Sequence, residues 1–298
     1  MRCFDANETV SALVADTVLK LMHKGGTGEV LMVNSAGVYL STDDQVWLLC
    51  DISCGAVPIG IAIDGFAHQI KRLCLEQGQK FCYRENRLIF SGRTLKLQPV
   101  IFNENQDCFA KPQLYLINQA AQDIVNLRKE RGISMLVLPL VLGLESHDIA
   151  ALNPYCTKAY PLFSRLIQAL SSDAESEVCE CVGSLLGLGV GLTPSADDVM
   201  LGMLYAFRKL VDGVPKSVDA FRASIFDKCD IRTNRVSAAY LKAVLSGAYF
   251  ERIDQVWRGL CGLEPLDTTV LTEVGSSSGA EMLLGVLIAL RVCGYSII

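Results

Sequence analysis

Two stretches of the chain, residues 191–202 and 275–285, place a serine three residues before an acid and then continue into an apolar run with one glycine. The matching pairs are Ser195 with Ser278, Asp198 with Glu281, and Gly202 with Gly285. Each stretch has the pattern of a loop that enters a helix. The first turn of a helix presents unpaired backbone N–H groups and the positive end of the helix dipole, which suit an anion. Two such helix starts in one chain predict a single site for a small anion or a phosphate.

The residue types around these stretches predict how the site is divided. We expect Asp197 and Asp198 to be the catalytic residues. Arginine matches the geometry of carboxylate and phosphate groups, and hydroxyl groups add hydrogen-bond donors. The expected substrate- or phosphate-binding residues are Gly191, Thr193, Ser195, Arg232, Thr233, Arg235, Ser277, Ser278, Gly279 and Glu281. Adjacent acids can hold a hydrated Mg²⁺ beside a phosphate, so Mg²⁺ is the one cofactor that the sequence suggests, and none is required.

A plainer interpretation makes each serine and acid a capping box, in which the two side chains satisfy backbone N–H groups of their own helix. Glycines precede the first motif at an unusual density, and capping gives no role to Asp197. Gly202 and Gly285 fall inside predicted helices, where a glycine costs about 1 kcal/mol relative to alanine. Close packing of the two motif helices would account for both glycines. The plainer interpretation of residues 232–237 is a capped surface helix with exposed arginines.

The composition favours a globular protein and excludes two classes. The chain has 298 residues, of which 51% are hydrophobic and 20% are charged, and its net charge is −5. A disordered coil and an electrostatically driven nucleic-acid binder are therefore not expected. Residues 1–5 are not followed by the apolar segment of a secretory signal, so we expect a cytoplasmic protein. The longest apolar run, residues 135–144, is far short of the roughly 20 residues that span a bilayer, which argues against a membrane role, and we expect it to be a buried strand.

Cysteine and histidine do not predict a metal centre. The 12 cysteines are scattered and lack the Cys-x-x-Cys spacing of zinc and redox sites, so we interpret them as reduced, mostly buried thiols. The three histidines are isolated from one another in sequence. Neither a histidine-rich metal site nor a catalytic triad can be argued from them.

Hydrophobic periodicity predicts an α+β fold, with an N-terminal β-rich region packed against a larger, mainly α-helical C-terminal region. We expect a helix at residues 10–21 and another at 66–75. The expected strands are 29–33, 38–41, 46–50, 57–63, 81–83, 87–90 and 94–97. A long helical stretch begins at Pro112, which places a domain boundary near residue 110 and gives domains 1–110 and 111–298. Further helices are expected at 160–171, 175–186, 196–210, 218–227, 236–245, 253–260 and 279–292. A cleft between the two domains is the natural place for a site.

The string from Gly189 to Asp198, together with residues 233–237 and 275–285, resembles the AllH-type family, which is associated with oxamate carbamoyltransferase. The resemblance is strongest between about residues 180 and 290. It implies a subunit that acts with other polypeptides in anaerobic allantoin and purine breakdown and exchanges a carbamoyl group between oxalurate and phosphate. The chain departs from the family pattern at Ala196, where relatives usually have glycine, and at Ser276, where a histidine is common. The second departure puts an identical substrate in question.

Three hypotheses follow. In the first, the chain is a subunit of a carbamoyltransferase-type complex that acts on oxamate or oxalurate and carbamoyl phosphate, with other subunits of that complex as partners and a small anion as substrate. In the second, the same site binds a nucleotide or phosphometabolite without turnover. In the third, the motifs are helix caps in a scaffold subunit. The sequence leaves open whether the chain also forms a homo-oligomer.

Overall fold

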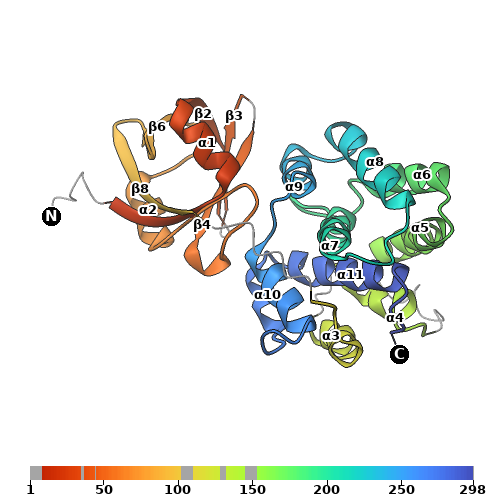
Figure 1. Ribbon diagram of the computed structural model, residues 1–298. Helices are drawn as coiled ribbons and strands as arrows, with labels where there is room; N and C mark the ends of the chain where they lie inside the picture. Colours follow the sequence, from red (N-terminus) through yellow and green to blue (C-terminus); the bar gives the residue numbers. More distant parts are fainter. Residues whose placement is uncertain are drawn as a thin grey trace. The chain divides into compact units, whose positions relative to one another are not determined.

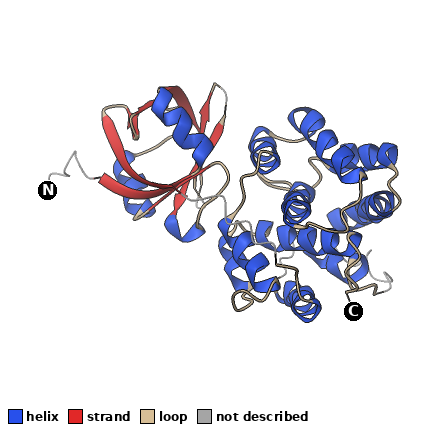
Figure 2. Ribbon diagram, in the orientation of Figure 1, coloured by secondary structure: helices blue, strands red, loops and turns tan. Residues whose placement is uncertain are grey.

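The computed structural model describes residues 9–34, 37–43, 45–101, 110–127, 132–144 and 153–297. Two compact units divide the chain, one formed by Met1–Asn105 with Ala248–Glu251 and the other by Gln106–Gly247 with Arg252–Ile298. The described strands lie in the first unit and most of the helices in the second, so the fold class is α+β (Figure 2). The domain boundary expected near residue 110 stays a prediction, because residues 102–109 lie outside the described ranges.

The first unit is a closed barrel with the strand order β1-β5-β4-β3-β2-β6-β7-β8 (Figure 1). Its strands are β1 (Thr9–Val14), β2 (Gly26–Val33), β3 (Val38–Thr42), β4 (Val46–Asp51), β5 (Gly60–Ile63), β6 (Lys80–Arg84), β7 (Arg87–Phe90) and β8 (Arg93–Ile101). The unit also contains the helices α1 (Asp16–Lys24) and α2 (Phe66–Leu73) and a 3-10 turn, η1 (Ile52–Cys54). The pairing of β1 with β8 is parallel and closes the barrel.

Aromatic side chains fill part of the barrel interior. Trp47 and Tyr83 meet edge to face with their ring centroids 4.7 Å apart, and Phe81 lies 5.2 Å from Phe90. Phe81 and Tyr83 point inward because buried and exposed residues alternate along β6. The hairpin between β6 and β7 turns at Glu85 and Asn86, both with positive φ, as a tight turn that matches the twist of the strands requires.

Two local expectations for this fold were wrong. Residues 10–14 form β1 and not the first part of a helix, and α1 begins only at Asp16. The alternating burial of β1 and its pairing with β5 and β8 outweigh the weak helical period of this segment. Residues 135–144 are not a strand, because η2 (Ser134–Leu136) and α4 (Val137–Leu140) occupy most of the run. A short apolar run cannot be assigned to strand or helix by periodicity alone.

The second unit is built around two buried helices, α7 (Ser195–Lys209) and α11 (Ser278–Val292). Both are apolar on nearly every side, which is the pattern of a helix in the centre of a protein. The surrounding elements are α3 (Leu114–Asn126), α5 (Pro154–Ser171), α6 (Glu175–Leu185), α8 (Ser217–Arg232), α9 (Arg235–Leu245), α10 (Glu251–Leu260) and the 3-10 helix η4 (Thr269–Glu273). Among the described elements, α9 packs against α7, whereas α3 and α5 pack against α11 (Figure 1). None of the described helices combines the length and the apolar character needed to cross a bilayer.

A buried ion pair lies at the C-terminal end of α7. Lys209 Nζ is 3.0 Å from Asp254 Oδ1, and the hydroxyl group of Tyr205 donates to the same carboxylate oxygen at 2.7 Å. The side chains of Lys209 and Asp254 are only 4% and 12% exposed. Removing one partner of such a pair leaves a buried charge without its counter-ion, which is far more costly than losing an exposed pair.

We therefore expect Lys209→Met to lower the free energy of unfolding of this unit by about 3–5 kcal/mol. The double variant Lys209→Met/Asp254→Leu should recover most of that loss, because it removes the uncompensated charge. Lys242→Met breaks the exposed ion pair with Asp230 and should cost less than about 1 kcal/mol. Chemical denaturation followed by circular dichroism measures all three, and a double variant as unstable as the single one would contradict the assignment.

Candidate functional site at the crossing of two helices

Glycines let α7 and α11 approach each other backbone to backbone. A Cβ atom at Gly202 would lie 1.9 Å from the carbonyl oxygen of Met282, and a Cβ atom at Gly285 would lie 1.9 Å from that of Val199. The two contacts are reciprocal. Each glycine faces, on the other helix, the residue three positions before the matching glycine, and these two residues, Val199 and Met282, match each other in the two sequence motifs. Among the described elements, no other pair of helices packs so extensively. The expectation that close helix packing explains both glycines is confirmed.

The crossing buries the acids of the two motifs. Asp198 and Glu281 are both fully buried. Glu281 accepts hydrogen bonds from the backbone N–H of Ile133 at 3.0 Å and from the Ser277 hydroxyl at 3.2 Å. The two carboxyl oxygens of Asp198 have no hydrogen-bond partner within the described part of the chain. Of the two acids, Glu281 is therefore the one with well-formed hydrogen bonds that favour a charged carboxylate.

Burial raises the pKa of Asp198 well above its ordinary value, and the neighbouring charge of Glu281 raises it further. The hydroxyl groups of Ser278 and Thr193 offset only part of this rise. Burial also raises the pKa of Glu281, but the hydroxyl of Ser195 and the donors already named counteract it. Two neighbouring carboxyl groups away from water cannot both be charged at low cost, and they titrate as a pair. We assign the shared proton to Asp198 and the charge to Glu281.

Hydroxyl groups from both motifs converge beside the acids. Thr193 Oγ1 and Ser278 Oγ are 3.1 Å apart, although they are separated by 85 positions in the sequence. Ser195 is buried at the start of α7. Neither α7 nor α11 has a side-chain hydrogen bond to its first N–H groups, so the capping-box interpretation of the motifs is wrong. The serines and acids interact across the two helices instead of within each one.

The helix starts present fewer open N–H groups than the sequence suggests. The N–H of Ala196 donates to the carbonyl of Leu188 at 3.0 Å, and that of Gly279 donates to the carbonyl of Val274 at 3.1 Å. Carbonyl groups of the loops before each helix thus accept hydrogen bonds from N–H groups that an anion would otherwise bind. Gly279 is buried against the carbonyl of Leu271, where no side chain would fit. The pattern supports a polar site lined mainly by hydroxyl groups.

The glycines before α7 shape the loop that leads into this helix. Gly187, Gly189 and Gly191 all have positive φ, which a side chain would strain. A Cβ atom at Gly189 would meet the backbone nitrogen of Ser195 at 2.3 Å, so the loop folds tightly over the helix start. Gly191 is exposed and faces open space at the tip of the loop. The density of glycine in the sequence thus has a geometric cause.

Asp197 points away from Asp198 and joins three segments. Its carboxylate accepts hydrogen bonds from the N–H of Gly187 at 2.8 Å, from the Ser237 hydroxyl at 2.6 Å and from the Thr233 hydroxyl. Burial raises its pKa, and these three donors counteract the rise. With its oxygens occupied, Asp197 is better placed to hold the glycine loop on α9 than to act on a substrate. The two neighbouring acids therefore do not converge on one ion, and the described residues contain no group of three or more His, Cys, Asp or Glu side chains that could hold a metal.

The two expected arginines lie elsewhere. Arg232 is exposed at the end of α8 and lines a pocket formed with α6, and Arg235 is exposed at the first residue of α9. Asn234 accepts hydrogen bonds from the N–H groups of Val236 and Ser237, which confirms that α9 is a capped helix. Thr233 belongs to the Asp197 network and not to the acid pair.

Sequence reasoning missed two contributors to the site. Ser237 holds Asp197, and the segment at Gly132 and Ile133 holds Glu281. A Cβ atom at Gly132 would lie 2.7 Å from the Glu281 carboxylate, so this position also needs a glycine. Ser237 follows a recognisable cap, but nothing local in the sequence links Gly132 to a residue so far along the chain. Ser276, which stands where relatives often have histidine, is exposed beside a very small cavity of about 10 Å³ that Ser277 also lines.

Comparison with known proteins places this segment in a family. Residues 185–290 match the family described as oxamate carbamoyltransferase subunit AllH. This part of the chain is similar to the AllH family. The match contains α7 and nearly all of α11, and therefore both acids of the buried pair. A search of solved structures found no match for the chain.

The helix crossing can be tested at Gly202. We expect Gly202→Ala to lower the free energy of unfolding by about 1–3 kcal/mol or more, because the added carbon must displace the backbone of α11 and not a flexible side chain. Gly183 is a matched control inside α6, where a Cβ atom would meet only the tip of the Lys228 side chain at 3.4 Å. Gly183→Ala should be neutral or stabilise by up to about 1 kcal/mol. Chemical denaturation compares them, and equal effects would contradict the close crossing.

The shared proton can be tested with Asp198→Asn, which resembles the neutral acid. The raised pKa means that the folded state binds a proton that the unfolded state releases, so this group makes stability fall as pH rises between the unfolded value, about 3.9, and the raised folded value. We expect the variant and the natural protein to have similar melting temperatures at about pH 4. The variant should melt higher at pH 8.

The exposed variant Asp219→Asn, in α8, should show no such divergence with pH. A constant difference between Asp198→Asn and the natural protein across this range would mean that Asp198 is not the group that holds the proton.

Proposed function

We propose that the chain is a subunit of a carbamoyltransferase-type complex, and that the crossing of α7 and α11 is its site for a small anionic substrate such as oxamate, oxalurate or carbamoyl phosphate. The family match at residues 185–290 supports the complex and its other subunits as partners. The observation that carries the site is the pairing of Thr193 and Ser278 hydroxyls over two buried acids. We place this activity in purine or allantoin catabolism in the cytoplasm.

The acid pair suits carbamoyl exchange between oxalurate and phosphate. In this reaction a phosphate oxygen forms a bond to the carbamoyl carbon, the bond from that carbon to the oxamate nitrogen breaks, and the nitrogen takes up a proton. Asp198 holds such a proton, and a positioned acid typically contributes about 10²–10⁴-fold to a rate. One of the Thr193 and Ser278 hydroxyls donates to the other, and the remaining one can donate to an oxygen on which charge develops. With Asp198 neutral, the acid pair also repels an anionic substrate less than two charged acids would.

Burial sets a condition on this mechanism. Asp198 and Glu281 are closed off from solvent, so the substrate reaches them only when part of the structure around them opens. The same burial favours a second candidate, a scaffold subunit in which the acid pair only joins the helices. An experiment must therefore separate loss of chemistry from loss of assembly.

We expect Asp198→Asn to lower the rate of oxalurate phosphorolysis by about 100-fold or more when the chain is co-expressed with its partner subunits. The complex should still assemble by size-exclusion chromatography, and the melting temperature should not fall. Asp219→Asn removes an exposed charge from α8 and should leave the rate unchanged.

Full activity of the Asp198→Asn complex would exclude Asp198 as the proton donor. Failure of that variant to assemble, with a normal fold of the chain alone, would favour the scaffold. Binding of a nucleotide but of no carbamoyl compound would favour a sensor without turnover.

A further inference from the structure

A second polar pocket lies between α6 and α8, separate from the acid pair. Its volume is about 480 Å³, within the usual range for small-molecule sites. Two cations from α8, Lys228 and Arg232, line the pocket. The opposite wall includes Gly183 and Ser184 of α6 and Leu186, which directly follows that helix. The proposed carbamoyl exchange gives this pocket no role.

The Lys228 ammonium group is held at the wall of the pocket. Its Nζ donates to the carbonyl oxygen of Cys179 at 2.6 Å, which uses one of its three hydrogens. Gly183 lies against it, since a Cβ atom at that position would be 3.4 Å from Nζ. The ammonium group is thus positioned in the pocket with donors that a ligand can accept.

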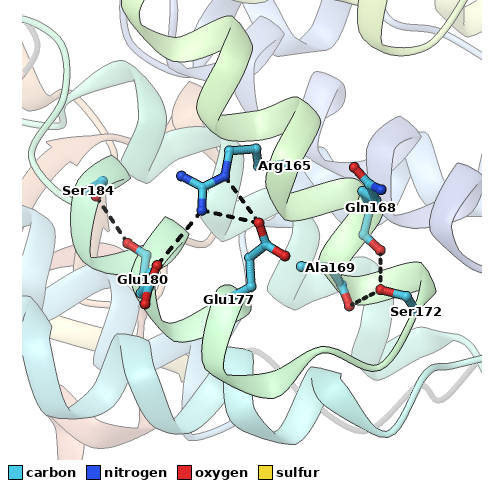
Figure 3. Close-up of polar contacts among 7 residues, drawn as sticks. All are labelled: Arg165, Gln168, Ala169, Ser172, Glu177, Glu180 and Ser184. Atoms are coloured by element: carbon cyan, nitrogen blue, oxygen red, sulfur yellow. Dashed lines mark hydrogen bonds and ion pairs between the residues drawn. The ribbon is translucent and has the colours of Figure 1, made fainter.

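The acid at the rim, Glu180, has its charge directed to another partner. Figure 3 shows its carboxylate facing the guanidinium group of Arg165, at 3.8 Å, beside the closer contact of Arg165 with Glu177 at 3.1 Å. Ser184 donates to the backbone carbonyl of Glu180 at 3.1 Å (Figure 3). The arrangement leaves Lys228 and Arg232 as the charges that dominate the pocket.

The pocket borders the glycine loop of the acid-pair site. The carbonyl oxygen of Arg232 packs against Gly187, where a Cβ atom would lie only 2.3 Å away, and Leu186 lines the pocket directly before that glycine. Thr233, the residue after Arg232, donates to Asp197. A ligand on Arg232 therefore sits one residue from Thr233, which shares the Asp197 carboxylate with the N–H of Gly187.

We infer that this pocket binds a small metabolite that carries a phosphate or carboxylate group, through Lys228 and Arg232. Arginine offers a planar fork of donors for such groups, and lysine adds a compact charge. The site does not depend on the proposed transferase activity, because its ligand contacts neither Asp198 nor Glu281.

Isothermal titration of the full-length chain tests the inference with three probes: inorganic phosphate, oxamate and adenosine monophosphate. Loss of one charge-assisted contact should weaken binding about 10- to 100-fold, so Lys228→Met and Arg232→Gln should each do so for at least one probe. Arg232→Lys should retain more of the affinity than Arg232→Gln if the charge at this position matters. The probe that binds tightest identifies phosphate or carboxylate as the preferred group.

Two controls locate the binding. Lys158→Gln removes an exposed charge from α5, outside the pocket, and should leave the affinity unchanged. A probe that binds at the acid-pair site instead would lose affinity in Asp198→Asn and keep it in Lys228→Met and Arg232→Gln, which separates the two places. Unaltered affinity in both pocket variants, an equal loss in Lys158→Gln, or no binding of any probe would overturn the inference.

Discussion

The contact between the backbones of α7 and α11 sets the constraints for the rest of the helical unit. Only glycine permits it, because a single carbon at Gly202 or Gly285 would overlap a carbonyl oxygen of the facing helix. Helices this close bring their first turns together, and with them the hydroxyls and acids of both motifs. The surrounding helices cover the pair on nearly every side, which removes the acids from water. Packing, and not a local cap, therefore decides the chemistry of these residues.

Removal from water gives three acids in the same region three different states. Asp197 receives three donors and is the structural link between the glycine loop and α9. Glu281 faces Ile133, Ser277 and Ser195 as donors and keeps its charge, whereas the more deeply buried Asp198, beside that charge, holds the shared proton because its pKa is raised. Burial raises the pKa of all three, and the neighbouring acids together with the hydrogen-bond donors decide how far each pKa rises.

The sequence predicted much of this because its signals were local. Helical periodicity located α6, α7, α9 and α11 to within one residue at each end, and the repeated serine, acid and glycine pointed to paired helix starts. The sequence-based prediction failed where contacts between distant segments determine the structure. Residues 10–14 become a strand only through pairing with β5 and β8, and Glu281 receives its donor from Ile133. The roles of Asp197 and Asp198 could not be separated either, because adjacent residues on a helix face different neighbours that only the fold supplies.

The same geometry decides which anion chemistry fits each place. At the acid pair, the attacking phosphate would face a charged Glu281 and helix starts whose N–H groups are partly occupied by their own loops, so its binding there depends on the hydroxyls and on a neutral Asp198. A ligand that combines donors and acceptors, as a carbamoyl compound does, meets hydroxyls for its oxygens and carboxyl groups for its N–H groups. At the pocket of Lys228 and Arg232 the balance of charge is reversed. Two cations line this pocket, and the nearby acid, Glu180, faces Arg165. Gly187 joins the two places, since a Cβ atom there would lie 2.3 Å from the carbonyl oxygen of Arg232 and its N–H donates to Asp197.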